Sequence, residues 1–173
     1  MKKPLKTTVV CALFCAFLCL CSLITVPAAI PFTLQSFAVY LALFSLGGLK
    51  TALCTALYLS LGALGLPVFS GMGAGLSALF GATGGFLFGF LLMALFFALL
   101  SRLTPDFRGK KPVLAAVCTL FCYACGVLWF ALVYAAGTVS LFDALFLCVL
   151  PFLLPDALKL TLAYAIARRV RTF

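Results

Sequence analysis

Six long apolar runs, separated by short polar or glycine-rich segments, make up most of this chain. They cover residues 7–27, 32–49, 51–66, 84–103, 112–136 and 143–169. A helix needs about 20 apolar residues to cross a bilayer, and the second and third runs are shorter than the others. The pattern predicts an all-α membrane protein with about six transmembrane helices.

The composition agrees with this pattern. Hydrophobic residues make up 66% of the 173 residues and charged residues 9%, whereas a soluble domain carries about 25% charged residues. No soluble fold could bury so much apolar surface, so we expect a single integral-membrane domain over residues 1–173. The first run follows three lysines, as in a signal peptide, but its length favours a retained helix.

The basic residues are distributed unevenly between the predicted loops. With the N-terminus in the cytoplasm and the helices alternating, eleven of the twelve basic residues fall on the cytoplasmic side. These eleven are Lys2, Lys3, Lys6, Lys50, Arg102, Arg108, Lys110, Lys111, Arg168, Arg169 and Arg171. The outer loops, near residues 28–31, 67–83 and 137–142, contain no basic residue. The positive-inside rule therefore predicts a cell-membrane protein with both termini in the cytoplasm, and explains the net charge of +9 without a nucleic-acid partner.

Two charged residues lie well inside an apolar run. Asp156 and Lys159 are about 13 and 16 residues into the last one, and a charge inside the membrane is costly unless it is paired. Their i, i+3 spacing places them on one helix face, where they can neutralise each other. The pair is either an ion bridge that fixes helix packing or the polar end of a ligand pocket.

Three further residues mark the same run. Pro151 and Pro155 precede the charged pair and predict a kinked helix that lines a cavity. Asp143 lies near the outer start of the run, where we expect it to cap the helix or to face the membrane interface.

A glycine-rich segment joins the third and fourth runs. Residues 65–85 contain seven glycines and no basic residue, which makes a phosphate-binding loop improbable. Such a density of glycine allows turns and a close approach of the backbone to a ligand. A flexible connection and a packing surface of small residues are the alternatives.

The nine cysteines all lie within apolar runs, so a disulfide framework is not expected. Cys122 and Cys125 have the spacing of a metal or redox pair, but the chain has no histidine and no second pair. We interpret the cysteines as buried apolar side chains and predict no metal and no cofactor. The chain also lacks a nucleotide-binding loop of the Gly-x-x-x-x-Gly-Lys-Ser/Thr type, so it depends on a partner for energy unless transport is downhill.

Three separated motifs resemble those of one family. Gly62-Ala-Leu-Gly-Leu-Pro-Val-Phe69, with the glycine-rich segment and Gly81-Ala-Thr-Gly-Gly-Phe86, is similar to the central signature of the BioY family, the biotin-binding S components of energy-coupling-factor (ECF) importers. Pro151-Phe-Leu-Leu-Pro-Asp-Ala-Leu-Lys159 and Pro31-Phe-Thr-Leu-Gln35 resemble two further elements of that family. The resemblance covers residues 8–170. The chain departs from the family pattern at Ala82 and Phe86, where Pro and Tyr are usual.

The resemblance implies a six-helix S-component bundle that captures biotin and docks onto a transmembrane T subunit with two ATPase subunits. Biotin needs an apolar slot and a few polar groups aimed at its ureido group and carboxylate. The candidate binding residues are Asp156, Lys159, Phe69, Ser70, Gly71, Thr83, Gly84, Gly85, Phe86 and Gln35. Ala12 and Ala16 form an Ala-x-x-x-Ala step, which in this family serves docking to the T subunit.

The sequence leaves two alternatives open. An S component for another vitamin would share the fold and differ in the pocket. An intramembrane enzyme would use Asp143 and Asp156 as an acid pair, although both lie in one predicted helix at different depths.

Overall fold

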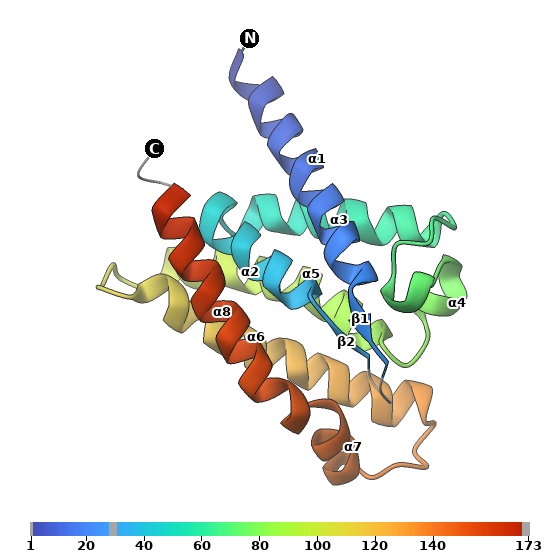
Figure 1. The fold of residues 1–173 in the computed structure, drawn as a ribbon. Coiled ribbons are helices and arrows are strands. Elements are labelled where there is room, and N and C mark those ends of the chain that lie inside the picture. The colour runs from blue at the N-terminus through green and yellow to red at the C-terminus, as the bar shows by residue number, and fades with distance from the viewer. Residues whose placement is uncertain (1, 28–30, 171–173) are drawn as a thin grey trace.

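The computed structural model describes residues 2–27 and 31–170, which form an all-α bundle with one short strand pair (Figure 1). The elements are α1 (Lys2–Leu23), β1 (Thr25–Val26), β2 (Phe32–Thr33), α2 (Gln35–Leu46), α3 (Gly48–Ala63), the 3-10 turn η1 (Ser70–Met72), α4 (Gly75–Leu79), α5 (Gly84–Leu103), α6 (Lys110–Leu128), the π-helical turn η2 (Trp129–Tyr134), α7 (Leu141–Cys148) and α8 (Leu150–Val170). The two strands pair antiparallel, with Thr25 opposite Thr33. The all-α prediction is confirmed.

Within the described residues, three helices are long and apolar enough to cross a membrane. They are α5, α8 and the continuous segment of α6 and η2, residues 110–134. The apolar part of α1 (Thr7–Leu23) and α2 (Gln35–Leu46) are shorter, and α3 has 16 residues. A turn at Gly47, whose φ of 81° suits glycine, separates α2 from α3 and lies before residue 50, where the hydrophobic pattern placed the boundary.

The last apolar run is two helices, which corrects the prediction of one kinked helix over residues 143–169. The break lies at Val149, between α7 and α8, because Pro151 has no N–H to continue the hydrogen bonds of α7. Pro151 is tolerated in the first turn of α8, and Pro155 lies inside that helix. Asp156 therefore sits in the second turn of α8 and not deep within a longer helix.

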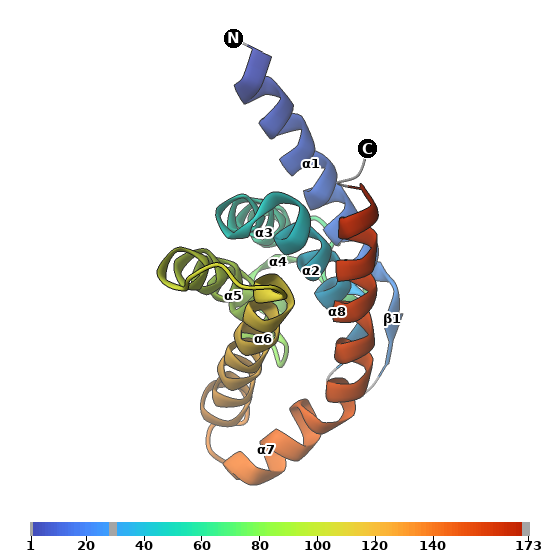
Figure 2. The ribbon, with the colours of Figure 1, turned by 90° about the vertical axis from the view of Figure 1, so that its left-hand side faces the viewer.

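Helix α2 occupies the centre of the bundle. It contacts α1, α3, α5, α6 and α8, and eight of its 12 residues are buried. Helices α5 and α6 form an antiparallel hairpin on one side, α8 lies on another, and α7 joins the ends of α6 and α8 (Figure 2). Residues from four of these helices can therefore converge beside α2.

The outer surface of the bundle is apolar. Leucines on all long helices are exposed, among them Leu13 at 64%, Leu120 at 61% and Leu158 at 64%. Such an apolar exterior is expected where lipid tails, and not water, surround the helices. The exposed leucines agree with the membrane location predicted from composition.

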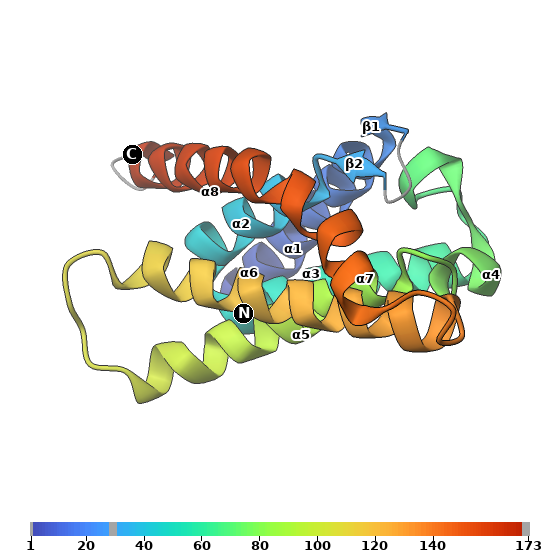
Figure 3. The same cartoon turned by 90° about the horizontal axis from the view of Figure 1, so that it is seen from below.

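The connections gather at two ends of the bundle. The loop between α5 and α6 and the end of α8 extend to one side, whereas α4 and the α6–α7 loop lie on the opposite side (Figure 3). The side of the membrane on which each group of connections lies stays a prediction. Residues 28–30 of the predicted first outer loop and Arg171 lie outside the described residues.

A lysine organises the loop between α5 and α6. Lys110 Nζ donates to the carbonyl oxygens of Ser101 and Thr104 at 2.9 and 2.7 Å and pairs with Asp106 at 2.9 Å. Its charge is well placed at the carboxyl end of α5, where carbonyls lack helical partners. The hydrogen bond from Lys110 lowers the pKa of the exposed Asp106 carboxyl.

Candidate functional site

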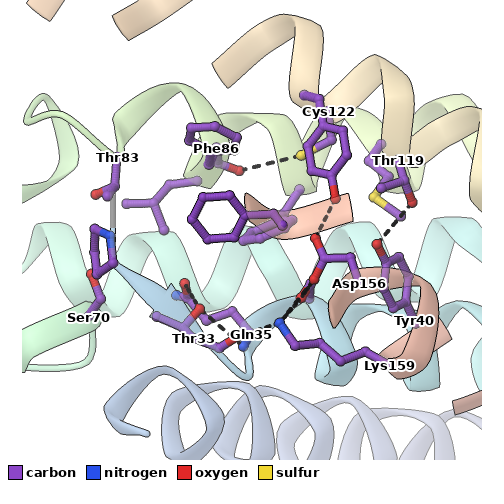
Figure 4. Close-up of a pocket in the computed structure, with 17 residues that line it drawn as sticks. Thr33, Gln35, Tyr40, Ser70, Thr83, Phe86, Thr119, Cys122, Asp156 and Lys159 are labelled. Atoms are coloured by element: carbon purple, nitrogen blue, oxygen red, sulfur yellow. Dashed lines mark hydrogen bonds and ion pairs between the residues drawn. The ribbon is translucent and has the colours of Figure 1, made fainter. Parts of the chain in front are cut away.

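A cavity of about 60 Å³ lies between α2, α5, α6 and α8 (Figure 4). Pro31 and Thr33, just before α2, close part of it. Its polar lining residues are Thr33, Gln35, Ser36, Tyr40, Ser70, Thr83, Thr119, Cys122, Tyr123, Asp156 and Lys159. Its apolar lining residues are Pro31, Phe86, Leu87, Phe90, Met93 and Phe152. The polar groups gather mainly at one end, around Asp156 and Lys159, and Ser70 and Thr83 lie at the other (Figure 4).

The ammonium group of Lys159 has a full set of acceptors. Its Nζ lies 2.9 Å from Asp156 Oδ1, 3.0 Å from Ser36 Oγ and 2.8 Å from the carbonyl oxygen of Thr33. An ammonium group has three N–H donors, so protein atoms account for all of them. The ammonium also lies 3.9 Å from the ring centre of Phe32, a favourable cation–π contact.

The carboxylate of Asp156 is held from three helices. Besides the contact with Lys159, Oδ1 accepts a hydrogen bond from Ser36 Oγ of α2 at 2.7 Å. Oδ2 accepts one from the Tyr123 hydroxyl of α6, also at 2.7 Å. Asp156 and Lys159 are 7% and 8% exposed, and the described part of the chain has no buried side-chain nitrogen or oxygen without a partner. The pair is therefore largely buried, neutral overall and held in one orientation by its hydrogen bonds.

A second polar network ties the cavity to the glycine-rich segment. The Gln35 side chain accepts from Thr33 Oγ1 at 3.0 Å and donates to the Tyr58 hydroxyl, which donates to the Val68 carbonyl oxygen at 3.1 Å. Ser22 of α1 donates to the same carbonyl oxygen. Gln35 is thus fixed as part of the cavity wall. Through Tyr58, its amide is linked to Val68, two residues before Ser70.

Comparison with known proteins places these features in one family. A model of the BioY family matches residues 1–173. The biotin transporter BioY of Thermotoga maritima is 34% identical over 167 residues, which is 92% of each chain. The chain belongs to the BioY family. The probable biotin transporter BioY of Pyrococcus horikoshii is 38% identical over 143 residues, 82% of this chain and 81% of that protein.

The fold agrees with this assignment to the BioY family. The crystal structure of the S-component for biotin from an ECF-type ABC transporter superposes with a TM-score of 0.86, at 23% identity. The match covers 99% of this chain and 93% of the other. An S-component bundle, as predicted, is therefore the fold of this BioY family member. The family and the fold point to a transporter and not to an enzyme.

The structure brings together six of the binding residues predicted from the BioY resemblance. Asp156, Lys159, Gln35, Ser70, Thr83 and Phe86 all line the cavity. Phe86 reaches it because Gly126 leaves room for its ring, since a Cβ at Gly126 would lie 2.3 Å from that ring.

Four other predicted residues lie away from the cavity lining. Phe69 is 2% exposed and packs edge-on against Tyr58 at 5.4 Å, filling the space left by Gly62. Gly71, with a φ of 65°, forms the turn η1. Gly84 and Gly85 do not line the cavity, because both are packed against other parts of the bundle.

Gly84 and Gly85, the glycine pair of the BioY signature, pack against Trp129. A Cβ at Gly85 would lie 2.2 Å from Trp129 Cβ, and one at Gly84 would lie 2.3 Å from the Leu79 carbonyl oxygen. Trp129 Nε1 donates to the Gly81 carbonyl oxygen at 3.1 Å and so anchors the start of α5. The two glycines therefore form a packing surface of small residues, one of the alternatives for this segment. Their contacts help to position the neighbouring Thr83 and Phe86.

Several cavity residues have no counterpart in the sequence prediction, notably Ser36, Tyr40, Thr119 and Tyr123. A buried tyrosine in an apolar helix generally needs a partner for its hydroxyl, and this signal marks Tyr40 and Tyr123. Thr119 Oγ1 lies 3.0 Å from the Tyr40 hydroxyl. Sequence alone does not indicate which partner each of them meets.

The remaining candidates have simpler roles. Asp143 lies in the first turn of α7, and Ser140 is the residue that caps this helix. Ser140 Oγ accepts from the backbone N–H of Asp143 at 3.1 Å and donates to its carboxylate at 2.7 Å. Cys122 lines the cavity, and among the described residues no group of three His, Cys, Asp or Glu is placed to hold a metal ion. Ala12 and Ala16 are both exposed on one face of α1, where they are accessible to a partner helix.

Proposed function

We propose that this chain is the biotin-capturing subunit of an ECF importer, and that its cavity is the biotin site. The proposal is supported above all by the buried Asp156–Lys159 pair at one end of an apolar cavity in a BioY-family chain. The names of the relatives and the fold of the S-component point to the same ligand.

The hydrogen bonds of the site favour one orientation of biotin. Lys159 has no unused donor, so a carboxylate would have to displace one of its protein partners. Among the described residues, Asp156 Oδ2 accepts only from Tyr123, which leaves room for one more donor. We therefore place the ureido N–H against Asp156, the fused rings between Phe86, Phe90 and Phe152, and the carboxylate toward Ser70 and Thr83.

Release of captured biotin into the cell requires partners. The chain has no nucleotide-binding loop, so a T subunit and two ATPase subunits would supply the energy, and the capture step needs no cofactor. The exposed Ala12 and Ala16 on α1 are the proposed T-subunit contact, since small residues allow close helix packing.

Biotin binding is the direct test. Calorimetry on the purified chain without ATP should show saturable binding of biotin to one site, because the proposed site is internal to the chain. Thiamine and riboflavin are the matched competitors. Preferential binding of either vitamin would replace the biotin proposal by an S component of different specificity.

The membrane orientation can be tested separately. A reporter fused after Phe173, which lies outside the described residues, should be cytoplasmic, and a reporter inserted near Gly73 should be outside, because eleven basic residues fall on the side of the C-terminus. Accessibility labelling of both sites from the cytoplasm would refute the proposed topology.

A further inference from the structure

Lys159 is the residue of the cavity whose role the proposed binding mode leaves open. It lines the cavity, yet its three N–H donors are taken by Asp156, Ser36 and the Thr33 carbonyl. It is also stacked over the Phe32 ring, which is itself stacked on Phe152. A lysine held in this way has no free donor for a ligand.

Lys159 supplies a positive charge to the cavity. Besides Lys159, Asp156 contacts the neutral hydroxyls of Ser36 and Tyr123. Tyr40 and Thr119, which line the same cavity and contact each other, are neutral as well. The ammonium at 2.9 Å is therefore the group that balances its carboxylate. The result is a buried acceptor with one open position and no net charge.

We infer that Lys159 makes the site selective for a neutral ligand head group by neutralising Asp156. This inference rests on the proposed function, with the ureido group against Asp156. A cationic head group of the same shape would bring an unbalanced charge beside a pair that is already neutral, which is strongly unfavourable away from water. Lys159 is thus a positioning and specificity residue that acts through Asp156, and it rejects cations by leaving them without a counter-ion.

The test uses biotin and 2-iminobiotin, in which a guanidino group replaces the ureido group. Guanidines are protonated at pH 7, so the two ligands differ in charge and hardly in shape. The wild-type chain should prefer biotin by at least about 10-fold. In Lys159→Met, the unbalanced Asp156 should attract the cation, and the ratio of the two dissociation constants should shift toward 2-iminobiotin by about 100-fold or more.

The double variant Asp156→Asn with Lys159→Met is the matched control. It also lacks the ammonium group, but it has no carboxylate to balance, so its preference should not shift toward 2-iminobiotin. A shift in the single variant that disappears in the double variant is the signature of charge balance. A purely structural lysine would weaken both ligands alike and leave their ratio unchanged, and that result would overturn the inference.

Two measurements keep the test decisive. If Lys159→Met does not fold in detergent, Lys159→Gln removes the same charge but retains a hydrogen-bond donor, and the same shift of the ratio is expected. Thermal stability of either variant should rise more with 2-iminobiotin than with biotin, because only the cation restores the missing charge. A wild-type chain that binds no biotin would refute the proposed function. If the chain binds biotin but the ratio of the two dissociation constants is unchanged in Lys159→Met and Lys159→Gln, this inference alone is refuted.

Discussion

Replacing Asp156 by asparagine should lower biotin affinity by about 10- to 100-fold. The carboxylate accepts from Ser36, Lys159 and Tyr123, and it is the proposed acceptor of the ureido N–H. An amide removes the charge and turns one oxygen into a donor, which would face a hydroxyl or ammonium donor. Hydrogen bonds to charged groups contribute about 1.5–3 kcal/mol, which corresponds to the expected loss. Calorimetry on the purified variant gives the measurement.

The single change also leaves Lys159 buried without a counter-ion, which by itself destabilises the fold. The double change Asp156→Asn with Lys159→Met removes this complication, because no unpaired charge remains. If the residues form the biotin site, the double variant stays folded in detergent yet binds biotin poorly. A folded double variant with wild-type affinity would mean that the pair serves packing alone.

Bulk added to the exposed face of α1 should uncouple capture from transport. Ala12→Leu with Ala16→Leu should leave biotin binding unchanged, because both side chains point away from the cavity wall. Overpacking of a helix contact costs about 1–3 kcal/mol, so co-purification with a T subunit and biotin uptake should fall by about 10-fold or more. Uptake of labelled biotin by cells and calorimetry on the same variant give the two readouts.

The matched control adds the same bulk elsewhere. Ala116 and Ala124 are exposed on α6, so Ala116→Leu with Ala124→Leu should impair neither binding nor uptake. Equal losses of uptake in both double variants would mean that the α1 face has no special role. Loss of biotin binding in the α1 variant would place these alanines in the packing of the bundle.

Much of the fold follows from the sequence because lipid imposes a strict local condition. Every backbone group in the membrane needs an internal partner, so each apolar run must be helical, and the six runs can be counted without a structure. The exact ends of the helices do not follow from hydropathy, because a single residue can decide them. Gly47 ends α2 early, and Pro151 forces the break at Val149.

The residue pattern alone also identifies the centre of the candidate site. Asp156 and Lys159 stand out because charges inside a membrane span are costly, and their spacing brings them together within one helix. The BioY motifs supplied Gln35, Ser70, Thr83 and Phe86, which line the cavity. These residues are recognisable from local pattern or from family resemblance.

The residues around that pair depend on how the helices pack. Ser36 and Tyr123 lie 120 and 33 positions from Asp156, and their hydroxyls reach it because α2 and α6 pack beside α8. The same packing buries Phe69 against Tyr58 and fills the space over Gly85 with Trp129. Hydropathy reports whether a side chain avoids water, but contacts between helices depend on how their surfaces fit together. The hydroxyl partners of the charged pair therefore became visible only in the folded chain.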